Sequence, residues 1–243
     1  MMKLKALVKR NLLQTLLDPL SLIFCLGFPI VMLVLLQTIF ASMEFIPPNF
    51  EIQNYAIGIC VFGYTFTMMF TAMNVAEDKN SQFIMRINMA PVKKSVYLFS
   101  FMVSSMPVAF VQTVIFLLIS LIFGFEFSVN LPIALGMLVS SMIFYVSFGV
   151  LLGSLCKTEK QAGPICSILI SASAMLGGVF MPIDNLGIFT TIVNFLPFTH
   201  TVKVASELYA SGITACLPHL FWVLGYSLAI WILIIIAYKL KKE

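Results

Sequence analysis

Histidine and cysteine are the side chains of this sequence best suited to metal binding or nucleophilic chemistry, and their spacing favours neither. The two histidines, His200 and His219, lack further ligands at a metal-binding spacing, so we interpret both as solvated or interfacial. No pair among the five cysteines has the spacing of a metal site or a disulfide framework. We therefore expect no bound metal, and we expect the cysteines to serve as apolar packing residues.

Catalytic and ion-coupling groups are missing from the apolar stretches of the sequence. The phosphate-binding pattern G-x-x-x-x-G-K-[ST] does not occur, so the chain is not expected to hydrolyse ATP alone. Intramembrane enzymes and ion-coupled transporters place ionisable side chains inside their spans, and no span interior here contains Asp, Glu, Lys, Arg or His. We expect no catalytic residue and no cofactor bound by this chain.

Long apolar runs are the elements that dominate the chain. Of its 243 residues, 60% are hydrophobic and 10% are charged, and the mean hydropathy is +1.04. Because about 20 apolar residues cross a bilayer as a helix, the sequence predicts an all-α integral membrane protein with one domain over residues 1–243 and six transmembrane helices. The predicted spans are about 20–40, 55–76, 96–123, 131–155, 165–181 and 219–238.

Two further helical elements are expected outside these spans, one before the first span and one before the last. Residues 2–17 combine leucines at helical spacing with Lys and Arg, which predicts an amphipathic helix along the membrane surface. Asp18 and Pro19 then form an N-cap and first position for a new helix, and Pro29 predicts a kink in it. The moderately apolar region 182–218 predicts an outer re-entrant or interfacial helical element before the last span.

The distribution of basic residues predicts the topology. The N-terminal segment, the loop 77–95, the loop between the fourth and fifth spans and the C-terminus together hold 13 of the 14 Lys and Arg residues. Only Lys203 falls in a segment assigned to the outside. The positive-inside rule therefore places both termini in the cytoplasm. Basic residues spread along span borders also disfavour a nucleic-acid partner and favour contact with membrane lipids.

Two patterns inside the spans have alternative interpretations. Gly149 and Gly153 form a GxxxG step, which suits close helix packing either within one chain, the interpretation we favour, or between two chains. The second span carries aromatic and methionine side chains, which suit an apolar binding surface for a ligand. Such side chains more often face lipid. They are Tyr64, Phe66, Met68, Met69 and Phe70.

The loop 77–95 contains the most informative cytoplasmic sequence. Phe83, Ile84, Ile87 and Met89 fall on one side of a short predicted helix, with charges elsewhere. Such a helix could dock onto a soluble partner or anchor the loop at the membrane surface, and the residues alone leave both alternatives open.

Three segments resemble the type-2 permease family of ATP-binding-cassette (ABC) transporters. Val8-Lys9-Arg10-Asn11 through Leu17-Asp18-Pro19-Leu20, with Pro29, resembles the family's amphipathic helix and first span. Glu77 through Arg86 to Ala90-Pro91-Val92 resembles its coupling loop, although Asn80-Ser81 stands where a Gly-Thr pair is common. Gly177-Gly178-Val179-Phe180-Met181-Pro182-Ile183, followed by Leu196-Pro197-Phe198-Thr199-His200, resembles its signature from the fifth span into the outer helices.

The resemblance implies a role for each of these segments. It implies a cytoplasmic coupling helix, a separate ABC ATPase that holds ATP and Mg²⁺, and a second permease copy in a homodimer or heterodimer. The residues implied in coupling to the ATPase are Lys9, Arg10, Glu77, Asp78, Lys79, Phe83, Arg86 and Pro91. Those implied in the substrate path are Tyr64, Met68, Ser171 and Met175, and those of the outer signature are Gly178, Met181, Pro182 and Pro197.

The sequence thus favours a non-catalytic permease subunit of an ATP-driven exporter in the cell membrane, by analogy a bacterial plasma membrane. The short outer loops favour a small amphipathic substrate such as a drug, a lipid or a hydrophobic peptide. The alternatives are a non-transporting membrane scaffold or immunity protein, and a secondary transporter.

Overall fold

The computed structural model describes residues 2–47, 50–89, 93–126, 131–181, 187–210 and 212–240, and the regular elements within these ranges are all helices. In chain order they are α1 (Met2–Leu17), α2 (Pro19–Leu22), a π-helical turn (Ile23–Gly27), α3 (Phe28–Phe40), α4 (Ile52–Asp78), α5 (Gln82–Met89), α6 (Lys94–Ser120), a 3-10 turn (Leu121–Phe123), α7 (Leu131–Leu155), α8 (Glu159–Leu176), α9 (Ile188–Val193), α10 (Pro197–Ala210) and α11 (Ile213–Leu240).

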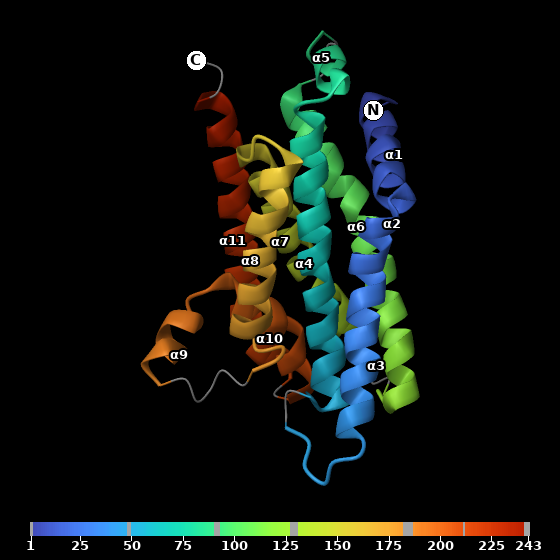
Figure 1. Ribbon diagram of the computed structural model, residues 1–243. Coiled ribbons are helices and arrows are strands. Elements are labelled where there is room, and N and C mark those ends of the chain that lie inside the picture. The colour runs from blue at the N-terminus through green and yellow to red at the C-terminus, as the bar shows by residue number, and fades with distance from the viewer. Residues whose placement is uncertain are drawn as a thin grey trace.

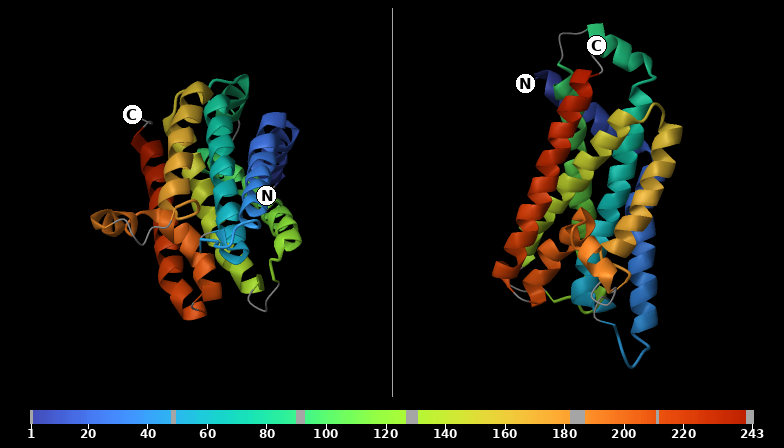
Figure 2. Two further views of the ribbon diagram at one scale, coloured as in Figure 1. Left: turned by 60° about the horizontal axis from the view of Figure 1, so that its bottom comes forward. Right: turned by 90° about the vertical axis from the view of Figure 1, so that its left-hand side faces the viewer.

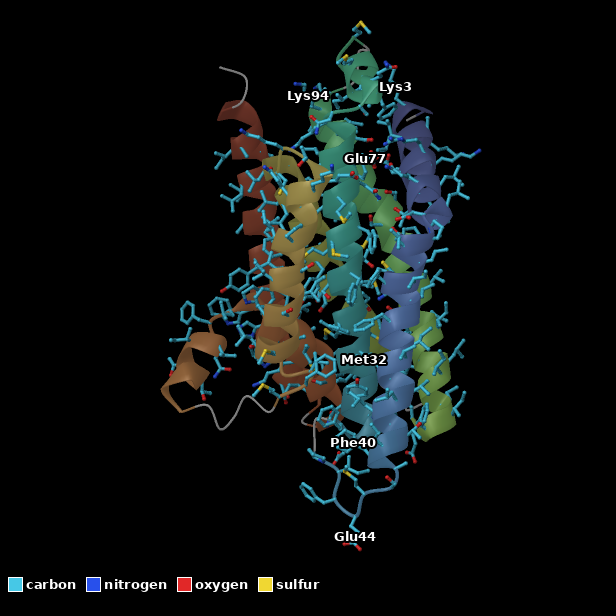
Figure 3. The ribbon with its side chains drawn as sticks, in the orientation of Figure 1. Lys3, Met32, Phe40, Glu44, Glu77 and Lys94 are labelled. Carbon is cyan, nitrogen blue, oxygen red and sulfur yellow. The ribbon has the colours of Figure 1, made fainter. Side chains whose placement is uncertain are left out.

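The long helices form one elongated bundle with different structures at its two ends (Figure 1). Helices α1 and α5 and the C-terminal end of α11 lie at one end, and α9 and α10 lie in the opposite half (Figures 1 and 2). Lys3, Glu77 and Lys94 lie at the first end, whereas Glu44 lies at the other (Figure 3). We call the first the charged end and the second the opposite end.

Five helical stretches in the described ranges are long and apolar enough to cross a membrane. They are Pro19–Phe40, Ile52–Asp78, Lys94–Phe123, Leu131–Leu155 and Ile213–Ala237. The remaining predicted span falls on α8, which has 18 residues and begins with Glu159 and Lys160. These charges and several serines lower its hydropathy, so the structure establishes a membrane protein with several apolar helices but does not by itself establish a sixth crossing.

The first apolar stretch begins as the sequence predicts. Asp18 caps α2, because its carboxylate accepts hydrogen bonds from the backbone N–H groups of Leu20 at 3.2 Å and Ser21 at 3.1 Å. Just before Pro29 the helix widens into the π-helical turn, where the N–H of Phe28 donates to the carbonyl of Ile23. Proline removes one α-helical bond partner, and this local change in helix type accommodates the loss.

Helix α4 lies at the centre of the bundle, and glycines let α7 approach it closely. A Cβ atom on Gly149 would lie 2.4 Å from the carbonyl oxygen of Met68, and one on Gly153 would lie 2.5 Å from that of Ala72. Only a residue without a side chain fits either position. The GxxxG step therefore packs within the chain, which confirms the interpretation favoured from the sequence.

Polar side chains on α4 bond to α6 inside the bundle. The hydroxyls of Tyr64 and Thr113 are 2.5 Å apart, and those of Thr71 and Ser105 are 2.9 Å apart. Because unpaired polar groups are costly in an apolar environment, these bonds favour one register between the two helices.

The close approach of α7 to α4 predicts different effects for two alanine substitutions on α7. Gly149→Ala should destabilise the protein by about 1–3 kcal/mol, since the new methyl group overlaps the α4 backbone. A Cβ atom on Gly136 would meet no atom of another described helix within 4 Å, so Gly136→Ala should be neutral or stabilise by up to about 1 kcal/mol. Unfolding of the detergent-purified variants would measure both, and equal effects would contradict this packing.

Candidate functional site

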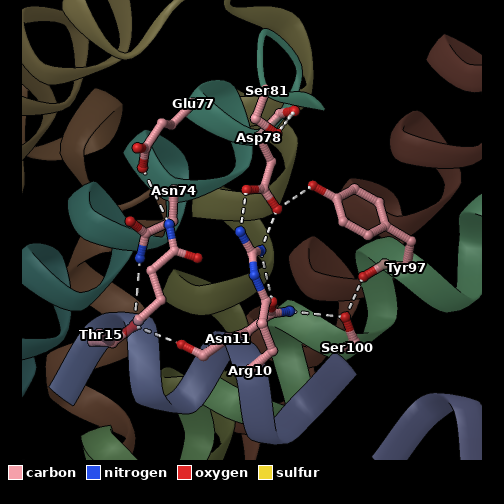
Figure 4. Close-up of polar contacts among 10 residues, drawn as sticks. Arg10, Asn11, Thr15, Asn74, Glu77, Asp78, Ser81, Tyr97 and Ser100 are labelled. Atoms are coloured by element: carbon pink, nitrogen blue, oxygen red, sulfur yellow. Dashed lines mark hydrogen bonds and ion pairs between the residues drawn. The ribbon is translucent and has the colours of Figure 1, made fainter. Parts of the chain in front are cut away.

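The side chain of Asp78, the last residue of α4, is the centre of a polar cluster at the charged end (Figure 4). Its side chain is 2% exposed and forms an ion pair with Arg10 of α1, whose side chain is 33% exposed. Arg10 Nη1 donates to Asp78 Oδ2, and Arg10 Nη2 donates to Oδ1 at 2.6 Å. The Tyr97 hydroxyl of α6 donates to Oδ2 at 2.9 Å. One carboxylate therefore joins α1, α4 and α6.

Neighbouring contacts attach α1 along its length. Asn11 Nδ2 donates to Ser100 Oγ on α6 at 2.9 Å, and Gln14 Nε2 donates to Glu77 Oε2 on α4 at 3.1 Å. The Arg10 guanidinium also lies over the Phe83 ring of α5, with its central carbon 4.1 Å from the ring centroid. Helix α1 thus contacts both the end of α4 and the helix that follows it.

The two residues after Asp78 bond to a different part of the bundle. Lys79 Nζ donates to the carbonyl oxygens of Ser154 at 2.5 Å and Cys156 at 2.7 Å, at the end of α7. Asn80 Nδ2 donates to the carbonyl oxygen of Lys157 at 2.7 Å. These donors satisfy carbonyls that the end of a helix leaves without backbone partners. The turn after α4 is therefore joined to the connection between α7 and α8.

Helix α5 presents one face to the bundle and another to its surroundings. Ile87 is buried, and Phe83 and Ile84 pack against the core. Met85 and Met89 are 64% and 80% exposed, at the far tip of the charged end. Two exposed methionines form an adaptable apolar surface next to charged residues, which suits a protein contact.

The remaining residues implied in coupling are placed as follows. Lys9 is exposed on α1, and Glu77 is exposed at the end of α4. Arg86 belongs to α5, but its side chain lies outside the described part of the structure, as does the whole of Pro91. The structure therefore brings Arg10, Asp78 and Phe83 into one cluster and places Lys79 beside it. Sequence reasoning did not identify Tyr97, Asn11 or Ser100, because an isolated polar residue near a span end carries no distinguishing pattern.

An apolar groove of about 590 Å³ runs between α3, α4 and α8. Its lining residues are Phe24, Phe28, Met32, Leu36, Phe62, Phe66, Met69, Ser167, Ile170, Ser171, Ala174 and Phe180. Aromatic and methionine side chains form most of this surface, and the two serines on α8 add hydroxyl groups. Such a lining can accept a mainly apolar molecule that carries a few polar atoms.

Only part of the residue set implied in the substrate path lines this groove. Ser171 does, whereas Met175 is exposed beside it, and Tyr64 and Met68 are fully buried away from it. On α4 the groove contains Phe62, Phe66 and Met69, which share one helical face, while Tyr64 and Met68 lie on another. Of the apolar residues singled out on the second span, Phe66 and Met69 are therefore the ones placed to contact a ligand.

The outer signature surrounds the start of α10. Gly178 has φ of +81°, a conformation that favours glycine. Met181 is exposed, Pro182 lies outside the described residues, and Pro197 opens α10 at a position where its missing N–H costs nothing. Beside it, the Thr199 hydroxyl of α10 donates to the carbonyl oxygen of Leu176 at the end of α8 at 2.9 Å.

The two histidines meet between α10 and α11. Their Nδ1 atoms are 2.7 Å apart and share a hydrogen bond, and the His200 ring stacks on Trp222 with ring centroids 5.3 Å apart. His200 is 5% exposed, so of the two expected environments, solvated or interfacial, the solvated one does not hold for this residue. Burial, and next the adjacent His219, lower the pKa of His200 below its ordinary value. In the described residues no group of three or more His, Cys, Asp or Glu is placed to hold a metal ion.

Comparisons with known proteins point to one family. A family model described as "ABC-2 type transporter" matches residues 2–209. The chain is 24% identical over 236 residues to the putative transport permease ycf38 of Cyanophora paradoxa, which covers 93% of this chain and 78% of that protein. It is 22% identical over 181 residues to ABC transporter G family member 20 of Dictyostelium discoideum, which covers 73% of this chain. The matched region spans only 24% of that second relative's length.

The buried ion pair predicts a stability difference between two charge-removing substitutions on α1. Among the described residues, Arg10→Met leaves the buried Asp78 carboxylate with Tyr97 as its side-chain donor, and should cost about 3 kcal/mol. Lys5→Met removes an exposed charge from the same helix and should cost less than about 0.5 kcal/mol. Unfolding in mixed detergent micelles would compare them, and equal stability of the two variants would refute the structural role of the pair.

The environment of His200 predicts a pH dependence. Because its pKa is lower in the folded than in the unfolded protein, the unfolded chain binds more protons as pH falls. Stability should therefore be greatest above the unfolded value of about 6.5 and decline at lower pH. The difference in melting temperature between pH 7.5 and pH 5.5 should shrink in His200→Gln, and an unchanged difference would contradict this assignment.

Proposed function

Since the chain belongs to the ABC-2 type transporter family, we propose that it is the membrane permease subunit of an ATP-driven exporter. The observation that carries this proposal is the structure of the charged end. There, α5 exposes Met85 and Met89 beside a turn that is bonded to α1 and to the α7–α8 connection. A helix that offers an apolar contact surface, and is attached at its base to several helices, suits the transfer of motion from a soluble partner.

The partner in this proposal is an ABC ATPase subunit, which binds ATP and Mg²⁺ and supplies the energy. The chain itself acts without catalysis, in keeping with a sequence that has no G-x-x-x-x-G-K-[ST] pattern. The ATPase docks on α5 and on the neighbouring exposed face of α1, which includes Lys9. Closure of the ATPase on ATP then displaces α5 and shifts the bundle between inward and outward access.

The proposed orientation places the charged end in the cytoplasm of a bacterial cell, with α8 as a sixth crossing of the plasma membrane. The gathering of Lys3 and Lys94 near α5, away from Glu44, supports this orientation (Figure 3). Helices α9 and α10 then form the re-entrant or interfacial element on the outer side, and α1 lies along the inner surface.

The groove between α3, α4 and α8 is the proposed substrate path. A second permease copy, identical or different, pairs with this face so that the two grooves line a common pathway. The aromatic and methionine lining supports a small amphipathic or hydrophobic substrate, of the class that includes drugs, lipids and hydrophobic peptides.

Reconstitution with the partner ATPase tests this function. We expect ATP-dependent efflux of a fluorescent lipophilic probe from proteoliposomes, and loss of efflux when the phosphate-binding lysine of the ATPase is replaced. Transport without any ATPase would indicate a secondary transporter instead. Stable binding of an ATPase with no transport of any amphipathic probe would indicate a scaffold.

A groove-filling substitution locates the path within the same assay. Ser171→Trp should abolish probe efflux while ATP hydrolysis continues, since the indole occupies the groove and leaves the charged end unchanged. Leu228→Trp adds the same side chain to an exposed position on α11 and should leave efflux intact. Equal efflux in the two variants would exclude the groove as the path.

A further inference from the structure

Two consecutive residues of opposite charge, Asp78 and Lys79, bond in different directions from the end of α4. Asp78 binds Arg10 of α1, and α1 leads through the Asp18-capped α2 into α3. Phe24, in the π-helical turn before α3, and Phe28 and Met32 of α3 line the groove. The carboxylate is therefore attached to the segment that forms the first wall of the groove.

Lys79 is attached to the segment that forms the second wall. Its ammonium group bonds to the carbonyls of Ser154 and Cys156 at 2.5 and 2.7 Å, and the backbone N–H of Lys157 donates to Gln161 Oε1 on α8 at 3.1 Å. Helix α8 then supplies Ser167, Ile170 and Ser171 to the groove. A cation at the C-terminal end of α7 also complements the helix dipole, which strengthens this attachment.

We propose that Asp78 and Lys79 are positioning residues that divide the movement of the α4–α5 turn between the two walls of the groove. Asp78, through Arg10, moves α1 and α3, and Lys79, through the carbonyls at the end of α7, moves α8. This inference rests on the proposed function and adds to it a separate connection for each wall.

The geometry favours two independent connections over a single rigid unit. The bonds of Asp78 reach α1 and α6, whereas those of Lys79 reach the end of α7 and the residue that follows it. Each is charge-assisted, and the burial of the Asp78 carboxylate makes its pair with Arg10 firmer than an exposed ion pair would be. Removing one should leave the other attached.

Distance measurements between spin labels test this division in the reconstituted complex. One label on α3 (Leu35→Cys) or α8 (Ile168→Cys) is paired with one on α11 (Leu228→Cys), at three exposed positions that do not line the groove. The native cysteines in the described structure are buried, which favours selective labelling. Labelled chains are diluted with unlabelled chains so that only distances within one chain are measured, with and without ATP.

In the unmodified chain, ATP should change both distances. Lys79→Met should abolish the ATP-dependent change of the α8–α11 distance and preserve that of the α3–α11 distance. Arg10→Met should abolish the change of the α3–α11 distance and preserve that of the α8–α11 distance. Lys79→Arg should restore the α8 change because it retains the cation. Lys160→Met, which removes an exposed charge from the start of α8, should preserve both changes.

The outcomes separate this inference from the function on which it rests. If ATP changes neither distance in the unmodified complex, the proposed function fails, and the inference fails with it. If the unmodified complex responds but Lys79→Met and Arg10→Met affect both walls equally, or neither wall, the inference alone is wrong. Should Lys79→Met fail to fold, Asn80→Gly removes only the bond to Lys157 and should still diminish the α8 change selectively.

Discussion

The burial of α4 inside the bundle is the constraint on which the rest of the arrangement depends. In the most apolar part of this helix 89% of the residues are buried by its neighbours, compared with 22% in Pro19–Phe40 and 22% in Ile213–Ala237. An enclosed helix needs close-fitting neighbours, which the glycines of α7 provide, and partners for its polar groups, which α6 provides. On the side of α4 between α3 and α8, Phe62, Phe66 and Met69 line the groove.

The same helix connects the groove with the charged end. Its middle forms the floor of the groove, while its last residue holds Arg10 and the next residue holds the end of α7. The walls of the groove belong to segments attached to these two residues. The tip of α5 is therefore linked through short polar contacts to both walls of an otherwise apolar groove. Polar contacts keep a defined geometry, whereas apolar surfaces could slide past each other.

Sequence reasoning reached the elements with strong local signals and missed those that depend on packing. Five of the six predicted spans, the Asp18 cap and the glycine step follow from periodicity and residue chemistry, and the structure contains each of them. Of the residues that the sequence singled out on the second span, Phe66 and Met69 line the groove and Tyr64 and Met68 do not. Their type could not distinguish them, because a helix enclosed by several neighbours has no polar face to reveal its orientation. The sequence also could not predict the contacts of Tyr97 and Lys79, because their partners are distant in sequence. In addition, Lys79 binds backbone carbonyls, which every residue type carries.

The polar bonds of α4 also have a consequence for the order of assembly. A helix synthesised before its partners enters the bilayer with Thr71 and Tyr64 facing hydrocarbon, because Ser105 and Thr113 follow only with α6. The bonds of Lys79 can form only later, because the carbonyls of Ser154 and Cys156 that accept them lie at the end of α7. The central helix is thus among the first to be synthesised and among the last to have all of its polar bonds formed.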